Sequence, residues 1–166
     1  MDPRPHRVVE RRRWLYYLLV GLCFGVVDFY FHTFIQRWTG LGVFFLGLGV
    51  WLVPLLPVVL NESAVTRRTS RAVAAGIAVW LAAIVAYYAY LGFNLVVIGR
   101  ASRPEMHFTS HTDPYYWSNV SYLFGDEVLG GILEWSPVAV VGGAAIGWLV
   151  STMYLRTTRA HGEALS

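Results

Sequence analysis

The chain contains no lysine, so all 13 of its Lys and Arg positions are arginines. A Schiff base to retinal or pyridoxal phosphate requires a lysine amine. A Ser–Lys protease dyad and a phosphate-binding loop of the Gly-x-x-x-x-Gly-Lys type require lysine as well, so these classes are excluded. Cys23 is the only cysteine, which excludes an intrachain disulfide, a Cys-x-x-Cys redox pair, a multi-thiolate zinc site and a covalently attached haem.

Charged residues are also scarce. They make up 14% of the chain, hydrophobic residues make up 56%, and the mean hydropathy is +0.49. Soluble domains carry about 25% charged residues, so the composition favours a membrane protein. The net charge of +3 and pI of 9.2 do not indicate nucleic acid, because the arginines flank apolar stretches. The expected partner is the lipid bilayer, and no nucleic-acid partner is predicted.

Four apolar stretches cover about residues 14–35, 42–60, 72–99 and 137–155. Each is long enough to cross a bilayer core of about 30 Å. The sequence therefore predicts one all-α integral membrane domain over residues 1–166, a bundle of four transmembrane helices. The first stretch follows an arginine-rich start, as in a signal peptide. Its length, the presence of Asp28 and the lack of a small-residue cleavage site predict a retained helix.

Arginine is concentrated on one side of this four-pass path. Only Arg37, Arg100 and Arg103 fall on the other side. The positive-inside rule then places both termini and the 61–71 loop in the cytoplasm. We expect a multi-pass protein of a bacterial plasma (inner) membrane, with its arginines on the inner side: Arg4, Arg7, Arg11, Arg12, Arg13, Arg67, Arg68, Arg71, Arg156 and Arg159.

Two features are expected to interrupt regular helix. Pro54 and Pro57 should kink the second stretch. A segment of about residues 100–136 between the third and fourth stretches should be external and structured. We predict that its first half, 101–114, is irregular, and that 115–135 contains a short interfacial or partly re-entrant helix.

One face of the first stretch carries both small and ionisable residues. Gly21, Gly25, Asp28 and His32 follow one another at steps of three or four, which places them on one side of a helix. Gly21 and Gly25 predict close packing against another helix. Asp28 and His32 would then point into the bundle, with Asp28 about 21 Å along the helix from the start of the stretch.

Ionisable residues inside a membrane are by default functional candidates. Tyr87, Tyr90 and Asn94 share a face of the third stretch and are candidate partners for the Asp28–His32 pair. Residues of the external segment would cover the outer side of this pocket. The His107-x-x-x-His111-x-Asp113 pattern has metal-ligand residue types, but poor helix formers separate them, so no metal site is predicted. The predicted ligand-binding set is Asp28, His32, Tyr87, Tyr90, Asn94, His107, His111 and Asp113.

Two hypotheses about function follow. The leading one is a non-enzymatic membrane subunit or carrier, in transport for example, that binds a ligand, ion or partner in this outward-facing pocket. Four helices rarely enclose a path alone, so a second copy or a larger membrane complex is expected. The alternative is a membrane-embedded hydrolase or transferase for a lipid-linked substrate at the outer leaflet, with Asp28 or His32 as general base. No cofactor is identified.

Overall fold

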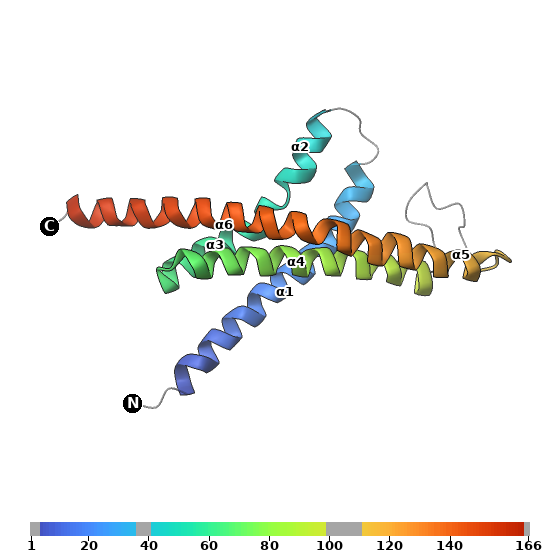
Figure 1. Cartoon of the computed structure of the whole chain (residues 1–166), viewed down its shortest axis with the longest axis horizontal. Coiled ribbons are helices and arrows are strands. Elements are labelled where there is room, and N and C mark those ends of the chain that lie inside the picture. The colour runs from blue at the N-terminus through green and yellow to red at the C-terminus, as the bar shows by residue number, and fades with distance from the viewer. Residues whose placement is uncertain (1–3, 36–40, 99–110, 165–166) are drawn as a thin grey trace.

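The computed structural model describes residues 4–35, 41–98 and 111–164, and every regular element in these ranges is a helix. Four helices are long and apolar enough to span a membrane: Val8–His32, Phe45–Thr66, Thr69–Ile98 and Tyr116–Ala160. The predicted all-α class and number of candidate spans are confirmed. The elements, shown in Figure 1, are α1 (Arg4–Ile35), α2 (Leu41–Gly49), α3 (Leu52–Thr66), α4 (Thr69–Phe93), the π-helix η1 (Asn94–Ile98), α5 (Tyr116–Leu123), the π-helix η2 (Phe124–Gly130) and α6 (Gly131–Ala164).

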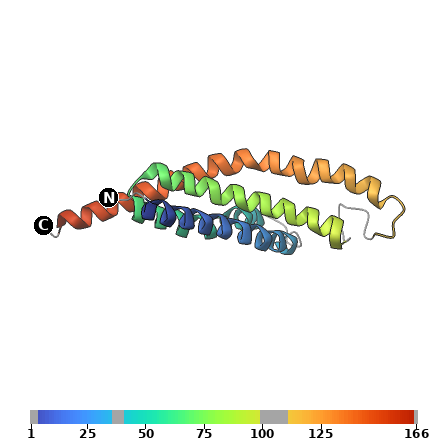
Figure 2. The same ribbon diagram turned by 90° about the horizontal axis from the view of Figure 1, so that it is seen from below.

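The α4 helix is the centre of the bundle. It packs against α1, α3 and α6, and α1 and α6 lie on opposite sides of it (Figure 2). In its most apolar window 56% of the residues are buried, against 29% or less in the other candidate spans. Its alanines and its two glycines allow this close approach from several directions.

The second predicted helix, 42–60, is two helices. The helix is interrupted at Val50 and Trp51, between α2 and α3. Pro54 has no N–H to donate to the carbonyl of Val50, which instead accepts from the N–H of Val53 at 3.1 Å. The interruption expected from the prolines therefore occurs, as a break just before Pro54.

The prediction of a loop over residues 61–71 was wrong. Helix α3 continues to Thr66 and α4 begins at Thr69, so only Arg67 and Arg68 connect them. Arg67 adopts a left-handed conformation with φ 54°, and its N–H caps α3 by donating to the Ser63 carbonyl. The polar residues after position 60 remain helical because several of their side chains have partners inside the bundle.

The last candidate span begins well before residue 137, where the sequence placed its start. A helical path runs from Tyr116 through η2 and α6, and Pro137 lies inside α6. The helix predicted within 115–135 exists, but it continues into the span instead of standing apart. Contacts with α4 hold it there: Val120 and Val128 are buried in its hydrophobic cluster. Residues 111–114 are turns; the rest of the predicted irregular half lies outside the described residues.

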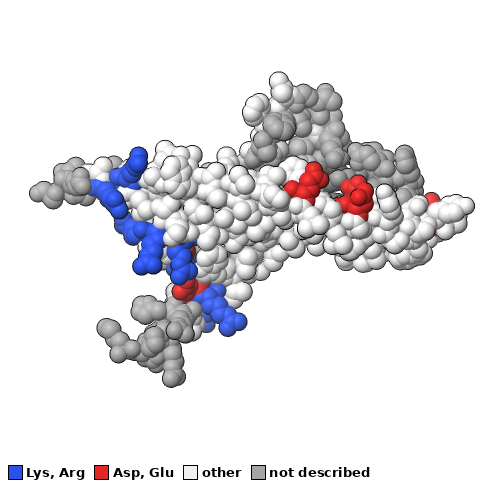
Figure 3. All heavy atoms as spheres, in the orientation of Figure 1, with Lys and Arg blue, Asp and Glu red and all other residues white. Residues whose placement is uncertain are grey.

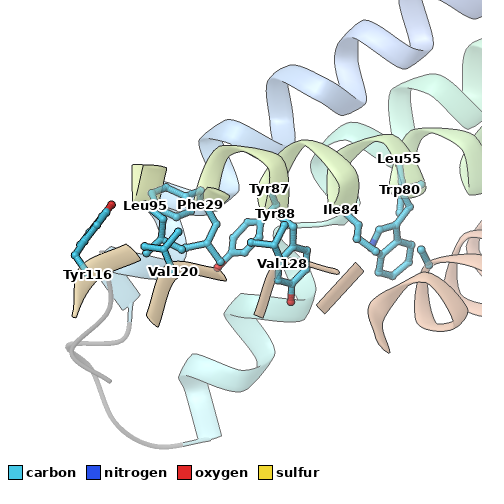
Figure 4. Packing of buried hydrophobic residues seen from close by; sticks show 12 residues of the cluster. Phe29, Leu55, Trp80, Ile84, Tyr87, Tyr88, Leu95, Tyr116, Val120 and Val128 are labelled. Atoms are coloured by element: carbon cyan, nitrogen blue, oxygen red, sulfur yellow. The ribbon is translucent and has the colours of Figure 1, made fainter. Parts of the chain in front are cut away.

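The main hydrophobic core lies along α4 and is rich in aromatic residues. Figure 4 shows Phe29 of α1 meeting Tyr87 of α4 in this cluster, where their ring centroids are 5.6 Å apart. On the opposite side of α4, Gly143 and Gly147 of α6 leave no room for a β-carbon against the α4 backbone. Small residues therefore set the spacing of α6 from α4.

Candidate functional site

The glycine face of α1 lies directly on α4. A β-carbon added at Gly21 would stand 2.5 Å from the carbonyl oxygen of Val79, and one at Gly25 would collide with the carbonyl of Ala83. The two backbones are therefore in contact at these positions. The prediction that Gly21 and Gly25 face another helix closely is confirmed.

Asp28 follows Gly25 on the same face and is completely buried. Neither of its carboxylate oxygens has a hydrogen-bond partner among the described residues. His32 lies one helical turn further along α1, and its Nδ1 is 3.4 Å from Asp28 Oδ1. Nδ1 is itself buried and forms no hydrogen bond within the described ranges. The His32 side chain as a whole is 36% exposed, so the imidazole connects the buried carboxyl group with the surface of the bundle.

An isolated aspartate is unfavourable at this depth. Near the centre of a membrane helix its insertion costs about 2.5–3.5 kcal/mol. The closest arginine on the same helix, Arg13, lies about 22 Å away along the axis and is bound to Glu62. On the other side of Asp28, His32 is the first residue of α1 that could carry a balancing positive charge. It is the last residue of the candidate span Val8–His32.

The residues predicted as partners of the Asp28–His32 pair, Tyr87, Tyr90 and Asn94, have different contacts. Tyr87 belongs to the site, since its ring packs edge-on against His32 with centroids 5.8 Å apart. Tyr90 instead forms a hydrogen bond with Tyr30 on a neighbouring face. Asn94 donates its Nδ2 to the carbonyl of Tyr90 at 3.0 Å, within its own helix.

The predicted external residues have contacts of their own. His111 Nε2 lies 3.0 Å from the Val96 carbonyl oxygen, and its ring stacks on Trp117. Asp113 Oδ1 accepts the Tyr115 N–H at 2.8 Å just before α5 begins. These contacts brace the start of α5 rather than the Asp28–His32 pair. His107 lies outside the described residues. Within the described part of the chain, no three His, Cys, Asp or Glu side chains are grouped to hold a metal ion.

A second buried carboxylate was missed from the sequence. Glu62 of α3 is fully buried and is bound by Arg13, with Arg13 Nε 2.8 Å from Glu62 Oε2. Tyr17 donates its hydroxyl to the same oxygen at 3.0 Å, and Asn61 donates to that hydroxyl at 2.7 Å. The sequence contains a pattern that indicates the burial of Glu62. Leu55, Val59 and Glu62 are spaced so that they share one helical face, and Glu62 therefore continues a row of buried apolar residues.

The two carboxylates therefore differ in kind. Glu62 has charged and neutral donors from another helix, which satisfies it and joins α3 to α1. Among the described residues, the ionisable side chain that faces Asp28 is His32. A satisfied buried charge is a structural feature, whereas an unsatisfied buried carboxylate requires an explanation.

Arginines mark one end of the bundle. All arginines whose side chains the structure describes gather where α1 begins and α6 ends (Figure 3). Two further contacts tie helices together at that end: Arg71 pairs with Glu10 at 2.6 Å, and Arg67 donates to Thr158 at 3.4 Å. Asp28 and His32 lie toward the opposite end.

Comparisons with protein-family models, with curated proteins and with solved structures find no match to this chain. The site is therefore interpreted from its own geometry.

Proposed function

We propose that the protein is a non-enzymatic membrane subunit or carrier that binds a small ligand or an ion at the Asp28–His32 site. The observation that carries the proposal is the buried Asp28 carboxylate, whose oxygens have no hydrogen-bond partner among the described residues. The histidine beside it is partly exposed, which would link the buried carboxyl group to the surface of the bundle. Intramembrane acids in this position mark ion and proton pathways.

The orientation is part of the proposal. The arginine end supports placing both termini on the cytoplasmic side of a bacterial plasma membrane, by the positive-inside rule. The site would then open outward. A second copy or a larger membrane complex remains the proposed context, because four helices rarely enclose a transport path alone.

The enzymatic alternative has less support. A hydrolase or transferase would need a second catalytic group near Asp28 or His32. His111 and Asp113, the described external candidates, have their contacts at the start of α5.

Thermal unfolding in detergent tests the proposal. Sodium, potassium, magnesium and calcium ions and a range of pH values serve as probes, with wild type and Asp28→Asn compared. The amide has nearly the same shape and no charge, so the variant should fold. A ligand present at a hundred times its dissociation constant adds about 2.7 kcal/mol, and this gain should be present in wild type and absent in Asp28→Asn.

Asp126→Asn is the matched control, because Asp126 is an exposed aspartate in η2. It should respond to the probes as wild type does. If wild type and Asp28→Asn respond identically to every probe, Asp28 binds none of them and the proposed function is wrong.

A further inference from the structure

We infer that the ligand of this site is a proton, which reaches the Asp28 carboxyl group through the imidazole ring of His32. The inference rests on the function proposed above and names the ligand. It starts from the charge balance of the pair. A neutral imidazole beside an ionised carboxylate leaves one buried negative charge, and a single added proton removes it.

No other charged group in the neighbouring described helices performs this role. Within its described bounds α2 has no titratable residue, and the one acid of α3, Glu62, is bound by Arg13 toward the other end of the bundle. The only arginine of α4, Arg71, pairs with Glu10 at the arginine end. What faces the pair from α4 is the aromatic ring of Tyr87, which packs edge-on against His32. A neutral pair is therefore the state that this surrounding favours.

The geometry also gives the proton a route. His32 Nδ1 is buried and faces Asp28 Oδ1, while the side chain as a whole is 36% exposed, so Nε2 is the ring nitrogen left to receive a proton from outside. An incoming proton binds Nε2, the imidazolium and the carboxylate then close from 3.4 Å to hydrogen-bond distance, and the proton on Nδ1 passes to Oδ1 of the carboxylate. The Nδ1–H bond breaks and the O–H bond forms, so the imidazole is left neutral in its other tautomer and Asp28 becomes a neutral acid.

Difference infrared spectroscopy of the full chain in liposomes tests where the proton resides. Across the pH range in which the protein stays folded, the carbonyl band of a protonated carboxylic acid should rise as the pH falls. Asp28→Asn should lose the band and the exposed control Asp126→Asn should retain it. Labelling wild type with ¹³C-aspartate should shift the band, and this measurement does not depend on any variant folding.

The rate of proton uptake tests the route through His32 separately. After a pH jump, His32→Gln should take up the proton about a hundredfold more slowly than wild type, the lower end of what a positioned proton-transfer group contributes. Added free imidazole should restore the rate. A purely structural His32 would change stability without this rescue, and that result would overturn the relay.

Failure of the inference can be told apart from failure of the proposed function. If sodium abolishes the band at constant pH, the site binds a cation: the proposed function stands and the proton is wrong. If no carboxylic acid band appears across the range, or if the ¹³C-aspartate label leaves it unmoved, Asp28 does not hold the proton. The thermal response of Asp28→Asn then decides separately whether the site binds anything.

Discussion

Replacing Gly25 by alanine should weaken the bundle by far more than one methyl group would suggest. The new β-carbon would stand 2.8 Å from the β-carbon of Ala86 and would also collide with the carbonyl oxygen of Ala83. Carbon atoms in van der Waals contact are about 3.5–4.0 Å apart. A backbone carbonyl cannot rotate away, so α1 must move from α4 by about 1 Å.

The size of the effect follows from that displacement. A gap of 0.5–1 Å forfeits about a quarter to a half of the attraction between facing atoms, and overpacking a well-filled core costs about 1–3 kcal/mol. We expect about 2 kcal/mol, which corresponds to about a thirtyfold change in the unfolding equilibrium constant. Gly25→Leu should be worse, because its longer side chain also has to be accommodated.

Unfolding with a denaturing detergent measures this directly. Gly42→Ala is the matched control: Gly42 is also helical, and a β-carbon there meets nothing within 4 Å. Alanine at that position should be neutral or slightly stabilising. The off-face change Val26→Leu should likewise be tolerated. If Gly25→Ala and Gly42→Ala unfold alike within about 0.5 kcal/mol, the close contact between α1 and α4 does not exist as described.

Three further outcomes can be measured. Glu62→Gln should destabilise the protein by up to about 3–5 kcal/mol, because it leaves the Arg13 charge unpaired, and exchanging the two residues should recover part of the loss in a double-mutant cycle. In intact cells, a cysteine at Ser70 should be protected from an impermeant thiol reagent and one at Thr112 should be labelled, in an otherwise Cys-free chain; the reverse pattern would contradict the proposed orientation. Tyr30→Phe should lower stability slightly through its lost hydrogen bond to Tyr90 of α4, and no change on denaturation would show that this bond contributes nothing.

The sequence predicted α1 well because its information is local. Gly21, Gly25, Asp28 and His32 repeat at helical spacing, and the meaning of small residues facing a helix does not depend on which helix is the partner. The number of candidate spans was equally accessible, since long apolar stretches are read without knowing the fold. Orientation in the membrane remains a prediction.

The errors came from features that depend on three-dimensional contacts. Arg13 and Glu62 are 49 residues apart, and nothing local says that they pair, so the sequence predicts a loop from Asn61 onward. The sequence also predicts that the last span starts at Pro137, although contacts of η2 with α4 hold the preceding residues in a helix. The hydrogen bond between Tyr90 and Tyr30 was missed for the same reason. Residue spacing shows which helical face Tyr90 lies on, but it does not show which side chain of another helix lies opposite.

The central position of α4 also has a consequence for how the chain is made. Helix α1 rests mainly on α4, which is the third candidate span to leave the ribosome, and only Arg67 and Arg68 separate α4 from α3. Until the third span has been inserted, the glycines of α1 and the carboxyl group of Asp28 have no covering helix. A nascent chain interrupted before α4 would therefore present an uncovered acid to lipid, which is the kind of lesion that membrane quality control can detect.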